Sequence, residues 1–160
     1  MIDNLKSTIS KLYHPPLVGR QVFALSRADA QKLPLIPSTA MISITSKERG
    51  EATLADFEYL LRLSFADVDF KNKDLSKRAK EKLSEAFQPA QAIQIIEFVD
   101  SLPSTIHTVV VHCEGGYSRS CAVAMFIHEK YNYSVELNKL AKFNPSVKQL
   151  LMETSKRNKK

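Results

Sequence analysis

The 160-residue sequence predicts one α/β domain with a mostly parallel central sheet and helices on both sides. Two observations lead to this prediction. Short runs rich in apolar and β-branched residues alternate with longer segments of helical periodicity, which is typical of strand–helix–strand units. One run, "TIHTVVVH" from Thr105 to His112, is continuous and β-branched, as expected of a central strand covered on both faces.

The first half of the chain supplies three expected strands, over residues 20–25, 40–45 and 59–65. Ser26 follows the first strand and is suited to cap a short helix over residues 27–33. The alternation in "AMISIT" favours a strand at the second position.

The second half supplies one strand and three helices. The helices are expected over residues 89–102, from about Ser120, and over residues 144–157. In the first of them Ala92, Ile96 and Val99 share one face. Asn144 can cap the last helix, with Pro145 in its first turn.

Chain length and composition indicate one domain, over residues 1–160, with residues 1–18 as an N-terminal extension and residues 155–160 as a basic tail. The chain is 44% hydrophobic and 25% charged, as globular proteins are. No apolar run approaches the ~20 residues of a membrane span, and the N-terminus lacks a secretory signal pattern. We therefore expect a cytoplasmic monomer.

A formal charge of +6 favours an anionic partner. Much of the excess comes from residues 70–82 and 155–160. Neither run interleaves the aromatic residues that stack on bases, so a solvated helix face and a frayed end explain them better than a nucleic-acid surface. We expect neither nucleic acid nor a membrane as partner.

The turn after the fourth strand carries the most informative chemistry. Cys113 enters a turn containing Gly115 and Gly116, and Arg119 precedes an apolar helix. Backbone N–H groups of such a turn form a nest for an anion, and the helix N-terminus adds partial positive charge. The same field favours a thiolate, and the planar fork of an arginine holds two phosphoryl oxygens. The pattern predicts nucleophilic attack on phosphorus.

The segment "HCEGGYSRS" resembles the His-Cys-x5-Arg-Ser/Thr signature loop of cysteine-dependent protein tyrosine phosphatases, most closely the small dual-specificity-type members of bacteria and phages. "LRLSFADVD" is similar to their acid loop, and the resemblance extends from Gly19 to about Leu151. It implies a hydrolase that removes phosphate from phosphotyrosine, and also from phosphoserine or phosphothreonine, in a phosphorylated protein substrate through a phosphocysteine intermediate. No cofactor or metal is implied.

The resemblance also implies residue roles. Cys113 is the nucleophile, and Ser120 assists the departure of the cysteine sulfur in the second step. His112 braces the loop, although a purely structural histidine in the core would give the same sequence pattern. Arg119 and the loop from Glu114 through Gly115, Gly116 and Tyr117 to Ser118 bind the phosphate. Asp67 matches the general acid, with Asp69 as the alternative.

Two other functions share this loop. A phosphate-binding pseudophosphatase would capture a phosphorylated partner without turnover, and a thiol redox enzyme of the arsenate reductase type would need a second thiol, for which only Cys121 is available. Cys121 is expected to be a small buried residue of the helix instead. Asn144 resembles a family segment that supports the signature loop, although helix capping alone would explain it.

Overall fold

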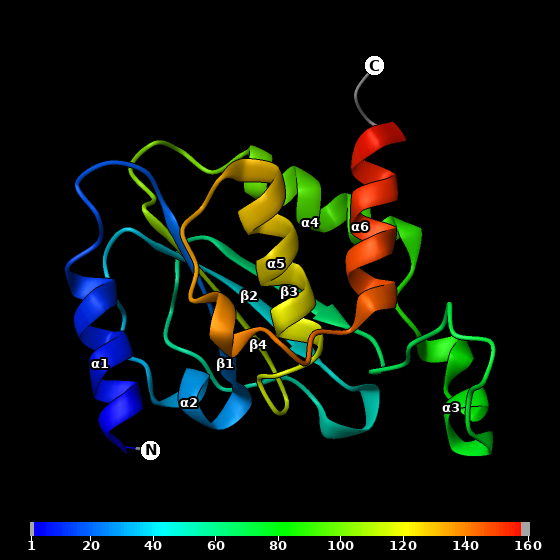
Figure 1. Ribbon diagram of the computed structural model, residues 1–160. Coiled ribbons are helices and arrows are strands. Elements are labelled where there is room, and N and C mark those ends of the chain that lie inside the picture. Colours follow the sequence, from blue (N-terminus) through cyan, green and yellow to red (C-terminus); the bar gives the residue numbers. More distant parts are fainter. Residues whose placement is uncertain (1, 158–160) are drawn as a thin grey trace.

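The computed structural model describes residues 2–157 and contains one sheet of four parallel strands (Figure 1). The strands are β1 (Gln21–Ser26), β2 (Thr39–Thr45), β3 (Leu60–Ser64) and β4 (Thr108–Cys113), arranged in the order β1-β4-β2-β3. The last strand in sequence is therefore inserted between the first two and pairs with both. The predicted fold class is confirmed. The strand predicted from Thr105 begins at Thr108, because the preceding residues form a turn closed by a hydrogen bond from Ile106 N to Pro103 O of 3.0 Å.

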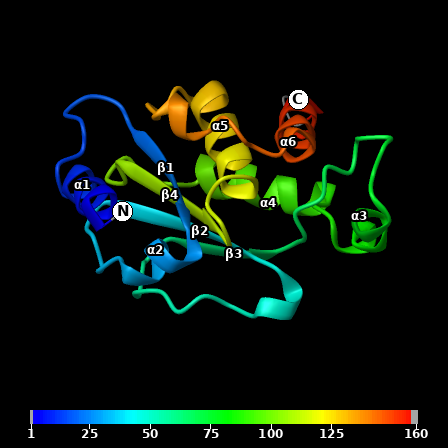
Figure 2. The same ribbon diagram turned by 60° about the horizontal axis from the view of Figure 1, so that its bottom comes forward.

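Helices cover both faces of the sheet. Three lie on one face (Figure 2): α4 (Pro89–Asp100), α5 (Arg119–Tyr131) and α6 (Pro145–Arg157). Two pack on the other: α1 (Ile2–Tyr13) and α2 (Arg27–Lys32). The connections contain a short helix α3 (Lys77–Glu81) and the single turns η1 (Lys47–Arg49), η2 (Leu83–Glu85) and η3 (Leu137–Lys139). No helix within residues 2–157 is both long and apolar enough to cross a membrane.

The core follows from the alternation of side chains along the strands. In β4, Val109 and Val111 belong to the large cluster beneath α4, α5 and α6, whereas Val110 belongs to the smaller cluster beneath α1 and α2. The helix face predicted in α4, with Ala92, Ile96 and Val99, is buried against the sheet. Since β4 is covered on both faces, the loop that follows it starts from the buried centre of the fold.

The N-terminal extension expected over residues 1–18 contains helix α1, which the sequence analysis did not predict. Leu12 is buried in the smaller cluster, with Leu5 and Ile9 packed against it. Their spacing is that of one helical stripe, so the signal was present in the sequence. At the other end α6 continues through Arg157, so the expected basic tail begins inside a helix; residues 158–160 lie outside the described residues.

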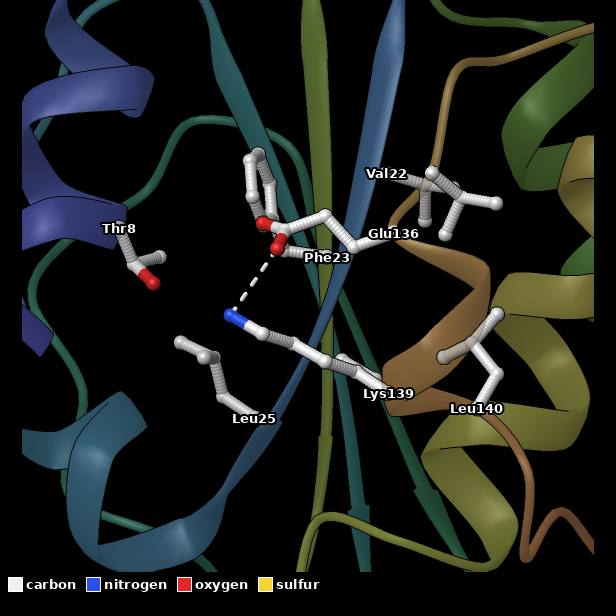
Figure 3. Close-up of a pocket in the computed structure, with 9 residues that line it drawn as sticks. Thr8, Val22, Phe23, Leu25, Glu136, Lys139 and Leu140 are labelled. Atoms are coloured by element: carbon white, nitrogen blue, oxygen red, sulfur yellow. Dashed lines mark ion pairs between the residues drawn. The ribbon is translucent and has the colours of Figure 1, made fainter. Parts of the chain in front are cut away.

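The outer edge of β1 is covered by side chains (Figure 3). A cavity of about 40 Å³ lies between α1, β1 and η3. Glu136 forms ion pairs there with Lys11 at 3.0 Å and with Lys139 at 3.1 Å. The hydrogen bond from Lys11 lowers the pKa of Glu136 below its ordinary value. The same outer edge of β1 is also paired with the chain at Ser134, where the backbone N–H of Val22 donates to Ser134 O over 3.0 Å.

Candidate active site

The candidate site lies where the parallel strands end. β4 ends at Cys113 and β3 ends at Ser64, so the loops that follow them emerge at the same edge of the sheet. This edge is where α/β sheets place their ligand sites. The topology brings the acid-bearing loop after β3 and the cysteine-bearing loop after β4 together, although they are far apart in sequence.

The loop after Cys113 curls around the sulfur. The backbone N–H of Gly116 donates to Cys113 Sγ over 3.2 Å, and Ser120 Oγ lies 3.1 Å from the same sulfur. Gly116 has φ of +78°, and a Cβ there would lie 2.4 Å from the backbone nitrogen of Ser26. Only glycine fits this position. Cys113 is 2% exposed, so the sulfur lies at the bottom of the loop.

The remaining loop amides are available to a ligand. Within residues 2–157, the N–H groups of Glu114, Gly115, Tyr117 and Ser118 donate to no protein acceptor. Tyr117 is 57% exposed, and its ring lies over Gly115. Unpaired amides around a tight turn are the donors that a phosphate group requires.

Arg119 begins helix α5 and is 4% exposed. Its Nη1 donates to Phe65 O over 2.6 Å and to Ser46 Oγ over 3.0 Å. Its Nε is buried and has no acceptor among the described residues. A buried guanidinium N–H without an acceptor is costly, and an oxyanion bound along the Nε edge would satisfy it.

Asp67, and not Asp69, contacts the signature loop. Asp67 Oδ1 accepts from Ser118 Oγ over 2.8 Å and from Asn144 Nδ2 over 2.9 Å. The carboxylate of Asp69 accepts instead from the hydroxyl of Ser146 at the start of α6. Of the two acids that the sequence left open, Asp67 is the one that lies against the signature loop, and its role as general acid stays a prediction.

Asn144 connects three segments. Its Oδ1 accepts from the backbone N–H groups of Ser146 and Val147, which caps α6. Its Nδ2 donates to Asp67 Oδ1 and to Val68 O, and its backbone N–H donates to Ser118 O. Both explanations that the sequence offered for Asn144 therefore apply, because it caps a helix and also fastens the two loops.

His112 is fully buried and neutral. Burial lowers the pKa of His112 below its ordinary value. Its Nδ1 lies 3.1 Å from Cys113 O, and because a carbonyl only accepts, Nδ1 carries the proton. Nε2 then accepts from Ser43 Oγ over 2.6 Å. The residue thus links the end of β4 to β2, and its role in bracing the signature loop stays a prediction.

Three contributors were missed by the sequence analysis: Ser46, Ser43 and Arg27. Arg27 pairs with Glu114 at 3.1 Å and also donates to Gly50 O and Glu51 O, which ties the signature loop to the segment after β2. The carboxylate of Glu114 is therefore paired with Arg27, and only the backbone N–H of Glu114 remains available to a phosphate. Ser46 follows a predicted strand, but nothing local indicates that it meets Arg119.

Cys121 is buried in α5, with its Sγ 3.4 Å from Gly116 O and 3.5 Å from Lys139 O. Burial, and then the neighbouring Cys113, raises the pKa of the Cys121 thiol to about 11. A thiol of this kind is a poor nucleophile near neutral pH. Across residues 2–157, no three His, Cys, Asp or Glu side chains are grouped as a metal site requires.

No protein family model matches the chain, and no curated protein matches it. Among solved structures, the chain overlaps the crystal structure of PTPMT1 in complex with PI(5)P with a TM-score of 0.42 and 16% sequence identity. The overlap covers 74% of this chain and 80% of that chain. An overlap this loose carries neither activity nor ligand over to this chain.

Proposed function

We propose that the protein is a phosphomonoester hydrolase that dephosphorylates phosphotyrosine, and also phosphoserine or phosphothreonine, in proteins. The proposal depends chiefly on one observation: Arg119 is buried at the end of the cysteine-bearing loop with its Nε unpaired. The unpaired amides of the same loop supply further donors to a phosphoryl group. Together, Arg119 and these amides stabilise the negative charge that develops on the equatorial oxygens of the phosphoryl group in the transition state.

In the first step, the Cys113 thiolate attacks phosphorus, and the bond from phosphorus to the leaving oxygen breaks. Asp67 Oδ1 already accepts two hydrogen bonds, so the proton of the neutral acid belongs on Oδ2. That proton moves to the leaving oxygen, which departs as a neutral hydroxyl. The products are a phosphocysteine and an ionised Asp67.

In the second step, water attacks the phosphocysteine. Asp67 takes a proton from that water, and the sulfur–phosphorus bond breaks to release inorganic phosphate. The Ser120 hydroxyl, 3.1 Å from Cys113 Sγ, donates to the departing thiolate. Atoms and charges balance without a cofactor.

The geometry favours hydrolysis over the two other functions. A redox cycle needs a second reactive thiol, but the raised pKa of Cys121, caused mainly by burial, makes it inert near neutral pH. A pseudophosphatase needs no general acid, whereas here Asp67 is held against the signature loop.

The proposal is tested by turnover of nitrophenyl phosphate with EDTA present and no added thiol. We expect turnover by the wild type, inhibition by vanadate, and loss of turnover in Cys113→Ser, because a serine hydroxyl does not ionise near neutral pH. Cys121→Ala is the matched control and should retain most activity. Mass spectrometry of rapidly quenched enzyme should detect phosphate on Cys113.

Contrary results would be informative. Retained turnover in Cys113→Ser would remove the nucleophile assigned here, and loss of activity with EDTA would indicate a metal enzyme. Phosphate binding by a wild type that hydrolyses nothing would indicate the pseudophosphatase.

A further inference from the structure

A hollow of about 290 Å³ lies beside the catalytic residues. Ser46 and Asp67 form the wall nearest the signature loop. Arg78, in helix α3, and Lys82, which directly follows that helix, also line the hollow. Its volume is close to the lower limit of pockets that bind small molecules, roughly 300 Å³. We refer to this hollow as the α3 groove.

The α3 groove is a built feature, because an apolar cluster fixes helix α3 against the acid loop. Ala66, Val68 and Ala86 are buried together, and Leu75 and Ala79 pack against them. Figure 1 shows α3 set apart from the helices that cover the sheet. The helix is therefore held beside the site and contributes little to the main core.

The segment that forms the outer wall is strongly basic. Residues 70–82 contain six Lys and Arg side chains and two carboxylates, which accounts for much of the chain's charge of +6. Lys71 pairs with Glu153 and Lys82 with Glu48. Arg78, which lines the groove, has no ion pair or hydrogen bond in the part of the chain that the structure describes.

Glu48 occupies the groove as an internal counterion. Its carboxylate lies 3.4 Å from Lys82 Nζ, and it lines the same hollow as Arg78. A hydrogen bond with its own backbone, followed by the hydrogen bond from Lys82, lowers the pKa of Glu48. An incoming carboxylate would compete with Glu48 for Lys82 and find Arg78 free.

We propose that the α3 groove binds acidic side chains next to the phosphorylated residue, so that the substrate is a phosphopeptide segment flanked by Asp or Glu. This inference rests on the proposed function. Ser46 accepts from Arg119 and Asp67 accepts from Ser118, so the groove begins at the side chains that surround the phosphate. Neighbouring residues of an extended peptide follow every ~3.3–3.6 Å and would enter the groove directly. A concave site with one free guanidinium suits a carboxylate on a peptide better than a flat lipid surface.

The experiment compares two synthetic phosphotyrosine peptides that differ only in flanking Glu or Gln. We expect the wild type to prefer the Glu peptide in kcat/KM by several fold, with the preference falling as salt screens exposed charges. Arg78→Ala should reduce this preference by about two- to fivefold, as an exposed ion pair would. Activity on nitrophenyl phosphate should be unchanged, because that substrate does not reach the groove.

Two further variants sharpen the test. Lys80→Ala removes a charge of the same helix that does not line the groove, and it should leave the preference intact. Glu48→Gln removes the internal competitor and should increase the preference for the Glu peptide. A loss of preference in Arg78→Ala but not in Lys80→Ala would separate a built site from a general charge effect, because each variant removes one positive charge from the same helix.

The outcomes distinguish this inference from the proposed function. If nitrophenyl phosphate is hydrolysed but the Glu and Gln peptides are equivalent, only the groove assignment is wrong. If nothing is hydrolysed, fluorescence anisotropy with the same peptides still measures whether Arg78→Ala weakens binding of the Glu peptide selectively. If Arg78→Ala instead abolishes binding to phosphatidylserine-containing vesicles and leaves peptide preference unchanged, the segment contacts membranes and the proposal is overturned.

Discussion

At the scale of single residues, the proposed role of Asp67 as general acid predicts that its importance depends on the leaving group of the substrate. An alkyl or unsubstituted phenyl oxyanion leaves poorly unless it is protonated, whereas a nitrophenyl oxyanion leaves almost unaided. Oδ1 of Asp67 is occupied by Ser118 and Asn144, which leaves Oδ2 for proton transfer. General acids of this kind contribute about 10²- to 10⁴-fold.

We therefore expect Asp67→Asn to reduce kcat/KM for phenyl phosphate or phosphotyrosine by ~10²-fold or more, and for nitrophenyl phosphate far less. Steady-state kinetics on both substrates measures the difference. Asp69→Asn is the control, because its carboxylate accepts from Ser146 and not from the signature loop. If Asp69→Asn shows the loss that depends on the leaving group, the acid assignment moves to that residue.

At the scale of elements, Asn144 couples the cap of α6 to the position of the acid loop. Serine at this position would still accept from the first amides of α6 but would lack the Nδ2 donors to Asp67 and Val68. Alanine would lose both functions. The pair of variants separates helix capping from loop positioning.

We expect Asn144→Ala to lower the free energy of unfolding by about 1–2 kcal/mol, and Asn144→Ser by less. Both should lower kcat on phenyl phosphate, because Asp67 loses a hydrogen bond that orients its carboxylate. Thermal unfolding and kinetics on the same samples provide the comparison. Wild-type activity in Asn144→Ser would mean that the residue only caps the helix.

At the scale of the whole molecule, neutral His112 makes stability sensitive to acid. Burial lowers its pKa in the folded state, so below the unfolded value of about 6.5 the unfolded chain binds a proton that the folded chain does not. The stabilisation is fully present above that pH. It is lost as pH falls toward the folded pKa.

The free energy of unfolding of the wild type should decrease below about pH 6.5, with this histidine contributing at most ~1.4 kcal/mol per pH unit. Denaturant titrations from pH 7.5 to 5 compare it with His112→Gln, which has no group that titrates there. The variant is expected to be less stable at neutral pH but to show a shallower slope. Parallel curves for the two proteins would mean that the pKa of His112 is the same in the folded and unfolded states.

Local patterns were sufficient for much of the fold. The strands were predicted because β-branched runs and alternating apolar residues reflect the environment of each residue, and Pro89 and Asn144 mark helix starts through short-range geometry. The turn at Gly116 could be predicted equally well, because Gly116, which has a left-handed backbone, lies close in sequence to Cys113 and Arg119. An anion site built from one continuous segment requires no knowledge of the rest of the chain.

Contacts between distant segments were decided only by the tertiary structure. Asp67 and Asp69 are two residues apart, and only the packing of the β3 loop against Ser118 and Asn144 distinguishes them. The contact between Ser46 and Arg119 and the placement of α3 beside the site likewise depend on the insertion of β4 between β1 and β2. Strand order in a parallel sheet arises from the burial of whole elements against one another, and neither the period nor the composition of any single segment encodes it.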